Sequence, residues 1–192
     1  MATTPNNLAI QAPTAKPVWL PKELLLAALW PAGRNVLQAA FNDDFVVQTP
    51  QFMGLKVAHV TQLNITHGIC ETLWHIVSKE VLVFNPLKRR KELQRQFDLK
   101  RAKKIPWCKP SIEQAADPAV MQWDKRESTG KIRSYVWLKH WDYVVILERK
   151  TSVSKQQYAM LITAFYVDNA HKRSDFSKDY DVYVANGYCV PL

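Results

Sequence analysis

Three β-type runs joined by short polar links dominate the last third of the chain, and they constrain its fold more than any other feature. Apolar and polar residues alternate along Ile132–Leu138, and two further runs, Tyr143–Glu148 and Tyr158–Val167, are rich in Val, Ile and aromatic residues. Adjacent strands with such short links pair antiparallel, because parallel neighbours need a long crossover connection. The sequence therefore predicts an antiparallel sheet in this region.

The residues after Val167 extend this sheet in the prediction. Asn186-Gly187 is a strong signal for a type I′ turn, because both central residues of that turn need a positive φ. We therefore expect Asp181–Ala185 and Tyr188–Val190 to form edge strands, which gives a sheet of about four strands.

The first half of the chain carries helical signals instead. Thr66 can cap a helix over Thr66–Lys79, in which Ile69, Leu73 and Ile76 repeat at helical spacing. The other expected elements are helices at Lys22–Trp30, Arg34–Phe41 and Ser111–Ala116, short strands at Phe45–Thr49 and Glu80–Phe84, a charged, helix-permissive stretch at 87–105, and a loop-rich link at Asp117–Lys131. Helices followed by a meander sheet predict an α+β fold, with N-terminal helices packed on a C-terminal antiparallel sheet.

The length of the chain, 192 residues, suits one domain with a core of its own. Residues 1–21 contain Pro5, Pro13, Pro17 and Pro21 among Thr, Asn and Ala, which predicts a flexible Pro-rich arm. Residues 22–192 are expected to form a single α+β domain.

The sequence also lacks the signals of several protein classes. The longest apolar run, Leu24–Trp30, is too short to span a bilayer, and no charged segment precedes an apolar core at the N-terminus. Three distant cysteines without a C-x-x-C pair predict neither a disulfide framework nor a zinc site, and they favour a reducing compartment. Phosphate-binding loops and the motifs of α/β-hydrolases and zincins are missing. We therefore expect a cytoplasmic protein without a membrane segment, metal or cofactor.

The strongest functional signal is a basic run. Between Lys88 and Lys104 lie nine Lys or Arg residues and only two acids, Glu92 and Asp98, in a chain whose formal charge is +9. Such dense positive charge favours a polyanionic partner, because each neutralised phosphate releases counterions. The alternative is a solvated helical face with a chance excess of basic residues. The residues expected to contact nucleic acid are Lys88, Arg89, Arg90, Lys100, Arg101, Lys103, Lys104 and Trp107, with Lys172 and Arg173 from a later loop.

The expected helix at Thr66–Lys79 carries two histidines and a glutamate on one face. His67, Glu71 and His75 lie four residues apart, which is helical spacing. The three could hold a metal, but no further cluster of ligands accompanies them, and a half-buried helix with a functional imidazole is the reading we favour. His75 is then either a satisfied core histidine or a general acid or base.

A second group of polar residues lies on and after the last β-type run. Thr163 and Tyr166 are three residues apart and hence on opposite faces of a strand, and Asp168–Arg173 forms a polar, basic loop. Metal-free RNA cleavage needs a base for the 2′-OH, an acid for the leaving oxygen and cations for the developing charge, and these residue types supply all three. Alternatively, Thr163 and Tyr166 are ordinary β-formers and the loop is solvated surface.

Three stretches of the chain form a set that is similar to a known family. They are Phe97–Trp107, Tyr135–Leu138 followed by Asp142–Glu148, and Leu161–Val167. Together they resemble phage- and mobile-element-encoded proteins of the barnase–EndoU–colicin–RelE ribonuclease superfamily. The resemblance covers roughly residues 55–183.

The resemblance implies a helical part packed on a four-stranded antiparallel sheet, and RNA cleavage without metal, often by a toxin. It points to His75, Arg101, Thr163 and Tyr166 as catalytic residues, with Lys172 and Arg173 as secondary candidates. The chain departs from better-known members because it has no obvious pair of catalytic histidines and no carboxylate on the sheet. A relative that binds RNA without cleaving it is therefore an alternative.

Three hypotheses for function follow from the sequence. The first is a metal-independent endoribonuclease, acting as a toxin or as an effector of a phage or mobile element, with RNA as one partner and an inhibitor or antitoxin protein as another. The second is a nucleic-acid-binding module without catalysis. The third is a protein-interaction factor of a phage or mobile element, whose Trp-rich surface and Pro-rich arm bind a protein.

Overall fold

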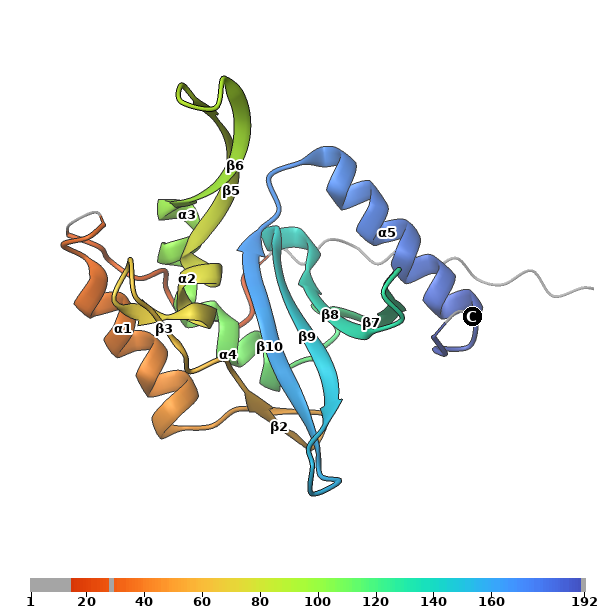
Figure 1. Ribbon diagram of the computed structural model, residues 1–192. Helices are drawn as coiled ribbons and strands as arrows, with labels where there is room; N and C mark the ends of the chain where they lie inside the picture. Colours follow the sequence, from red (N-terminus) through yellow and green to blue (C-terminus); the bar gives the residue numbers. More distant parts are fainter. Residues whose placement is uncertain (1–14, 28–29, 191–192) are drawn as a thin grey trace, which may run out of the picture.

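The computed structural model describes residues 15–27 and 30–190, and Figure 1 shows how their helices and strands are arranged. A six-stranded sheet forms the centre. In it, β9 (Tyr143–Thr151) pairs antiparallel with β8 (Ile132–Leu138) and with β10 (Gln157–Tyr166), so the three predicted strands are confirmed. A further strand, β7 (Met121–Arg126), pairs with β8 inside the stretch that was expected to be a loop.

The predicted fold class, with about four antiparallel strands, is wrong because the sheet is larger and mixed. β2 (Leu55–Ala58) runs parallel to β10, and β1 (Gln51–Phe52) pairs with β2. The strand order is β1-β2-β10-β9-β8-β7, and the sheet curls as Figure 1 shows. A short strand whose partner lies about a hundred residues later leaves no local signal in the sequence, because only tertiary packing selects that pairing.

The C-terminal edge strands are also wrong, because a helix, α5 (Ala170–Ala185), takes their place. The side chain of Asn169 caps it, accepting a hydrogen bond from the backbone N–H of His171 at 2.8 Å. Phe176 and Tyr183 lie two helical turns apart and are both buried, so the helix has an apolar face for the sheet. Gly187, with a φ of +66°, follows the end of the helix and makes no hairpin turn.

Four shorter helices lie on the other side of the sheet from α5 (Figure 1). They are α1 (Arg34–Asn42), α2 (Glu71–Val77), α3 (Leu99–Lys103) and α4 (Cys108–Glu113). The helix predicted from Thr66 begins only at Glu71, because Gly68 adopts a φ of +67° and Cys70 acts as the N-cap. A π-helical turn at Asp43–Val47 replaces the short strand expected there.

Residues near the N-terminus pack against the body of the protein. Of the expected arm at 1–21, residues 1–14 lie outside the described part, while Leu20 is buried and the indole N–H of Trp19 donates to Asp117 at 2.9 Å. Residues 21–27 are not helical where the helix at Lys22–Trp30 was predicted, and residues 28–29 of that stretch are not described.

Both faces of the central sheet are buried. On β9, Tyr143 and Val145 face the core beneath the four short helices, whereas Val144 and Ile146 face a second core beneath α5. This double burial explains why the strand reads as a continuous apolar run. In the second core the rings of Trp123 and Trp137 each lie 5.6 Å from Phe176, so these tryptophans serve packing and are not surface residues.

A β-hairpin stands apart from the central sheet. β5 (Ser78–Asn85) and β6 (Arg90–Phe97) pair only with each other, and Figure 1 shows the hairpin projecting from the body. A second, minor hairpin joins β3 (Leu63–Asn64) to β4 (Ile69–Cys70). The helix-permissive stretch at 87–105 is thus a strand over Arg90–Phe97 and a helix only over Leu99–Lys103. The side chain of Asn85 accepts from the N–H groups of Leu87 and Lys88 at 3.0 and 3.2 Å and fixes the turn before the strand.

Candidate functional site

A cleft with an excess of basic residues lies where the base of the β5–β6 hairpin, α3 and the end of β10 meet. It consists of a hollow of about 370 Å³ and a neighbouring one of about 50 Å³, which share Lys79, Arg101 and Asp168. We call this region the basic cleft. Its lining residues are Lys79, Glu80, Arg95, Asp98, Lys100, Arg101, Thr163, Phe165, Tyr166 and Asp168.

Arg101 is one of the three residues that the two hollows share, and the start of α3 positions it. Asp98 caps this helix by accepting from the backbone N–H of Arg101 at 3.1 Å. The guanidinium group donates from Nη1 to the carbonyl oxygen of Ser78 at 2.6 Å and lies 5.0 Å from the ring centre of Phe165. Burial lowers the pKa of Arg101, yet a guanidinium stays charged at every physiological pH.

Arg95 brings a second guanidinium group to the same carbonyl oxygen. Its Nη1 donates to the carbonyl oxygen of Ser78 at 3.4 Å and to the Ser78 hydroxyl at 3.3 Å. Its Nη2 lies 3.4 Å from a carboxylate oxygen of Glu80, which is mostly exposed. Two like charges on one acceptor repel each other, and the charge of Arg95 contributes to the lowered pKa of Arg101. An anion placed between them would relieve this repulsion.

Lys172, in the first turn of α5, adds a third cation. Its Nζ lies 4.2 Å from the ring centre of Phe165, which Arg101 also approaches. Burial of the ammonium group lowers the pKa of Lys172, the charge of Arg101 lowers it further, and Asp168 opposes the shift. Two cations, from α3 and α5, therefore lie near one aromatic ring.

Thr163 and Tyr166 both reach the basic cleft, although on different sides of β10. A register shift between Leu161 and Thr163 interrupts the ladder with β9 at this point. Thr163 lines the larger hollow and Tyr166 the smaller one. Among the residues predicted to be catalytic, the structure thus brings together Arg101, Thr163 and Tyr166.

His75 does not share this cleft. It lines a separate hollow of about 200 Å³ with Val60, Glu71, Thr72, Leu161 and Ile162. Burial and the charge of Arg95 lower the pKa of His75, and Glu71 and Glu80 oppose the shift. His67 stacks on Trp74 with ring centres 3.6 Å apart, which gives it a packing role.

The predicted nucleic-acid contacts differ in their exposure. Lys88, Arg89 and Arg90 lie at the exposed tip of the β5–β6 hairpin, and Lys100 is exposed on α3. By contrast, Lys104 and Trp107 are buried within the fold. The remaining residues are Lys103, which is half-buried on α3, and Arg173, which donates to the Val167 carbonyl oxygen and forms an ion pair with Asp142, each at 2.9 Å.

Several residues of the cleft carry no signal of their own in the sequence. Arg95, Lys79 and Phe165 enter it only because residues 78–97 form a hairpin and because β10 ends beside α3. The Asn85-Pro86 turn after the β-like stretch Glu80–Phe84 is the signal that could have indicated the hairpin. In the structure the register of the hairpin puts Arg95 directly opposite Glu80.

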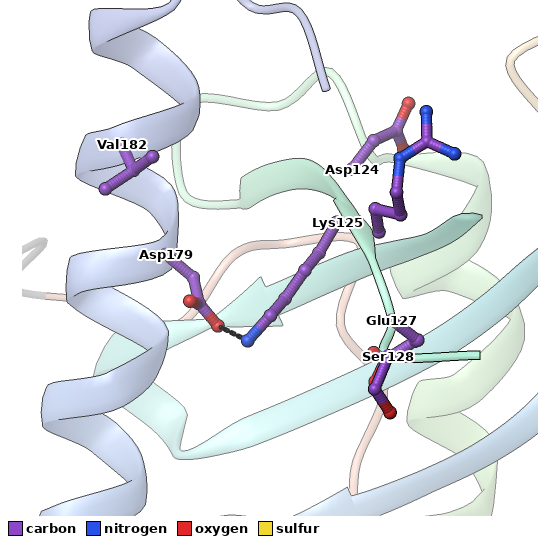
Figure 2. A pocket seen from close by; sticks show the side chains of 7 residues that line it. Asp124, Lys125, Glu127, Ser128, Asp179 and Val182 are labelled. Atoms are coloured by element: carbon purple, nitrogen blue, oxygen red, sulfur yellow. Dashed lines mark hydrogen bonds and ion pairs between the residues drawn. The ribbon is translucent and has the colours of Figure 1, made fainter. Parts of the chain in front are cut away.

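Another pocket, of about 310 Å³, lies between β7 and α5 (Figure 2). Three of its charged groups have partners. Lys125 forms an ion pair with Asp179 at 2.7 Å, and the buried Asp124 pairs with Arg149 at 2.8 Å and accepts from the Ser134 hydroxyl at 2.6 Å. In the basic cleft, Lys79 pairs with Asp98 at 2.8 Å and Arg95 with Glu80 at 3.4 Å, while the Arg101 guanidinium donates to a backbone carbonyl oxygen.

The described residues contain neither a metal-binding cluster nor a membrane-spanning helix. No cluster of three or more His, Cys, Asp or Glu residues suited to a metal ion occurs within residues 15–27 and 30–190. In the same part of the chain, no helix is long and apolar enough to cross a bilayer.

Comparison with protein-family models, with curated proteins and with solved structures found no match to this chain. The resemblance to the ribonuclease superfamily therefore stays a prediction from the residues that carry it.

Proposed function

We propose that this protein binds nucleic acid, RNA above all, by holding backbone phosphates in the basic cleft. The observation that carries the proposal is the pair of guanidinium groups, Arg95 and Arg101, which share the carbonyl oxygen of Ser78. Each guanidinium has five N–H donors, and the planar group matches a phosphate in shape and charge. A phosphate between them would accept charge-assisted hydrogen bonds and offset their repulsion.

The distribution of charge favours a polymer over a single phosphorylated small molecule. Lys88, Arg89 and Arg90 lie at the far end of the hairpin, well outside the cleft, and they are exposed. Lys88 and Arg90 have only one acidic side chain between them as a partner, Glu92, at 3.0 Å from each. A polyanion that extends from the cleft along the hairpin would meet both groups of cations.

The test is binding of a short, labelled RNA, measured by fluorescence anisotropy in EDTA over a series of salt concentrations. We expect the double variant Arg95→Gln/Arg101→Gln to lose roughly 100-fold in affinity, because hydrogen bonds between charged groups contribute about 1.5–3 kcal/mol each. Arg126→Gln/Lys178→Gln is the matched control, since it removes two exposed charges from β7 and α5. Equal affinities for the two double variants would refute the proposal, provided that both unfold at the wild-type temperature.

A second candidate function is RNA cleavage by the same cleft without metal. The observation that favours it is the position of Lys172, whose Nζ lies 4.2 Å from the ring centre of Phe165, a residue that lines the cleft; burial also lowers the pKa of Lys172 and makes its ammonium group a better proton donor. A base such as Asp168 would take the proton of the 2′-OH, the 2′ oxygen would attack phosphorus, and Lys172 would protonate the leaving 5′ oxygen. Arg101 would stabilise the charge on the phosphorane.

Incubation of RNA with the protein in EDTA, followed by gel analysis, tests this second candidate. The geometry predicts that Lys172→Ala and Thr163→Ala slow cleavage, while His75→Ala does not, because His75 lines a different hollow. If the RNA stays intact at high protein concentration, cleavage is excluded and only the binding proposal remains.

A further inference from the structure

The β5–β6 hairpin has one face that leads out of the basic cleft. Strand alternation puts Glu80, Leu82 and Phe84 of β5 on one face of the hairpin. Their cross-strand partners on β6, which are Arg95, Leu93 and Lys91 in that order, lie on the same face. Glu80 and Arg95 line the cleft, so this face begins there and continues towards the tip. We call it the hairpin track.

The apolar side chains of the hairpin track are exposed. Leu82 is 66% exposed, Leu93 65% and Phe84 59%. Leu82 and Leu93 are direct cross-strand partners, and Phe84 pairs with Lys91 one step nearer the tip. Large apolar residues on a projecting, otherwise basic arm indicate a surface that binds a partner.

The chemistry of the hairpin track fits one kind of partner best. The partner must offer flat apolar surface to Phe84 and negative charge to the cations on either side of it, namely the tip and the cleft. Unpaired nucleotides offer both, because every base has an exposed π-face and every linkage a phosphate. A duplex hides its base faces within the stack, so it could use the cations but not the ring of Phe84.

We propose that the hairpin track holds an unpaired segment of RNA, with a base stacked on Phe84 and with phosphates running from Lys91, the cross-strand partner of Phe84, to Arg95 and Arg101 in the basic cleft. Phe84 lies four residues from Glu80 along β5, or about 13 Å at about 3.3 Å per residue, so one strand can reach both places. The inference rests on the proposed function and specifies its substrate class as single-stranded.

The experiment compares the affinity of each variant for a single-stranded RNA and for a duplex of the same length. We expect Phe84→Ala and Phe84→Leu to weaken single-strand binding about tenfold, because one base stacked on an aromatic ring contributes about 1–3 kcal/mol. Duplex binding should not change. Phe84→Trp should keep the wild-type affinity, which separates loss of the ring from loss of apolar area. A single-stranded RNA with photoreactive uridines should crosslink to β5 or β6.

The outcomes distinguish failure of this inference from failure of the proposed function. If Arg95→Gln/Arg101→Gln abolishes binding while all Phe84 variants bind single strands normally, the hairpin track is overturned and the cleft stands. If the wild-type protein binds neither the single-stranded RNA nor the duplex, both this inference and the proposed function fail. If the wild type forms dimers in sedimentation runs without RNA and Phe84→Ala is monomeric, the track binds a second copy of the chain, which also overturns the inference.

Discussion

Residues 88–101 and residues 103–109 carry the same kinds of side chain and follow one another in a single basic segment, yet the protein uses them differently. In the second stretch Lys104 is only 8% exposed, forms an ion pair with Glu23 at 2.5 Å and lies 3.4 Å from the ring centre of Trp107. The indole N–H of Trp107 in turn donates to the carbonyl oxygen of Pro21 at 3.0 Å. In the first stretch the cations lie on the projecting hairpin or in the basic cleft.

The difference teaches that density of charge along a sequence does not measure a binding surface. A cation is available to a ligand only if the fold has not already buried it with a partner. Lys104 is buried between Glu23 and Trp107, whereas Arg95 and Arg101 share one carbonyl oxygen and Glu80, the acidic partner of Arg95, is mostly exposed. We therefore expect variants of the second stretch to change stability and variants of the first to change binding.

The largest expected effect is loss of stability in Trp107→Ala. Trp107 is 4% exposed and packs edge-on against Tyr143, with ring centres 5.6 Å apart. Truncation should lower the free energy of unfolding by about 3–5 kcal/mol, because a cavity replaces the ring. Phe84→Ala, an aromatic truncation on the exposed hairpin, should change it by less than about 0.5 kcal/mol. Urea denaturation measures both, and similar losses would erase the distinction between the two stretches.

Lys104→Gln comes next and should also act on stability alone. The change removes the contact of the buried Lys104 with the buried Trp107 ring and the ion pair with Glu23, which is partly exposed. We expect a loss of about 1–2 kcal/mol in the free energy of unfolding, mainly from the cation–π contact. Affinity for RNA, measured at a temperature where the variant is folded, should equal that of the wild type. A loss of affinity would place Lys104 in the interface.

Removal of two cations at the hairpin tip should have a smaller effect, and on binding only. For Arg89→Gln/Arg90→Gln the slope of log affinity against log salt should become less steep by about 1.4, because each phosphate contact on a single strand contributes about 0.7. Thermal unfolding should not change, because both side chains are exposed. An unchanged slope would confine the phosphate contacts to the basic cleft.

The smallest expected effect is a dependence of binding on pH that originates at Lys172. Its pKa lies below the ordinary lysine value of 10.5 because of burial and the charge of Arg101, with Asp168 opposing. Below this pKa the ammonium attracts phosphate, and as the pH rises through it the charge and its share of the affinity are lost. We expect the affinity of the wild type to fall a few-fold in moderately alkaline buffer and that of Lys172→Arg to stay constant. The same decline in both proteins would assign the effect to another group.

The strands of the central sheet could be predicted where their own residues carry the signal. β8, β9 and β10 are rich in β-branched and aromatic residues, and all three were found where expected. β7 was missed because Gln122, Asp124 and Lys125 make it look like a loop, although Trp123 between them is buried. Its pairing with β8 makes it a strand, although its composition does not favour one.

The errors at α5 and at the β5–β6 hairpin have a common cause. Val182, Tyr183 and Val184 have a β preference, yet the packing of Tyr183 beneath the sheet and the cap at Asn169 make them helical. Conversely, the Lys, Glu, Leu and Gln residues of β6 favour a helix, and the turn at Asn85 overrides them. Local preference decides only where tertiary contacts do not.

The candidate site was predicted in part for the same reason. Arg101, Thr163 and Tyr166 were expected from the sequence and share the basic cleft, whereas Arg95 reaches it only through the register of the hairpin. His75 was expected to join them, but α2 directs it to a different hollow.

The hairpin has one more consequence, for modular design. Its two strands pair only with each other, and Ser78 and Phe97 at its base are direct cross-strand partners. Such neighbours can be joined by a short turn, so residues 79–96 can be excised without cutting through the central sheet or either core. The chain thus carries the exposed apolar residues Leu82, Phe84 and Leu93 on a segment that is separate from both cores.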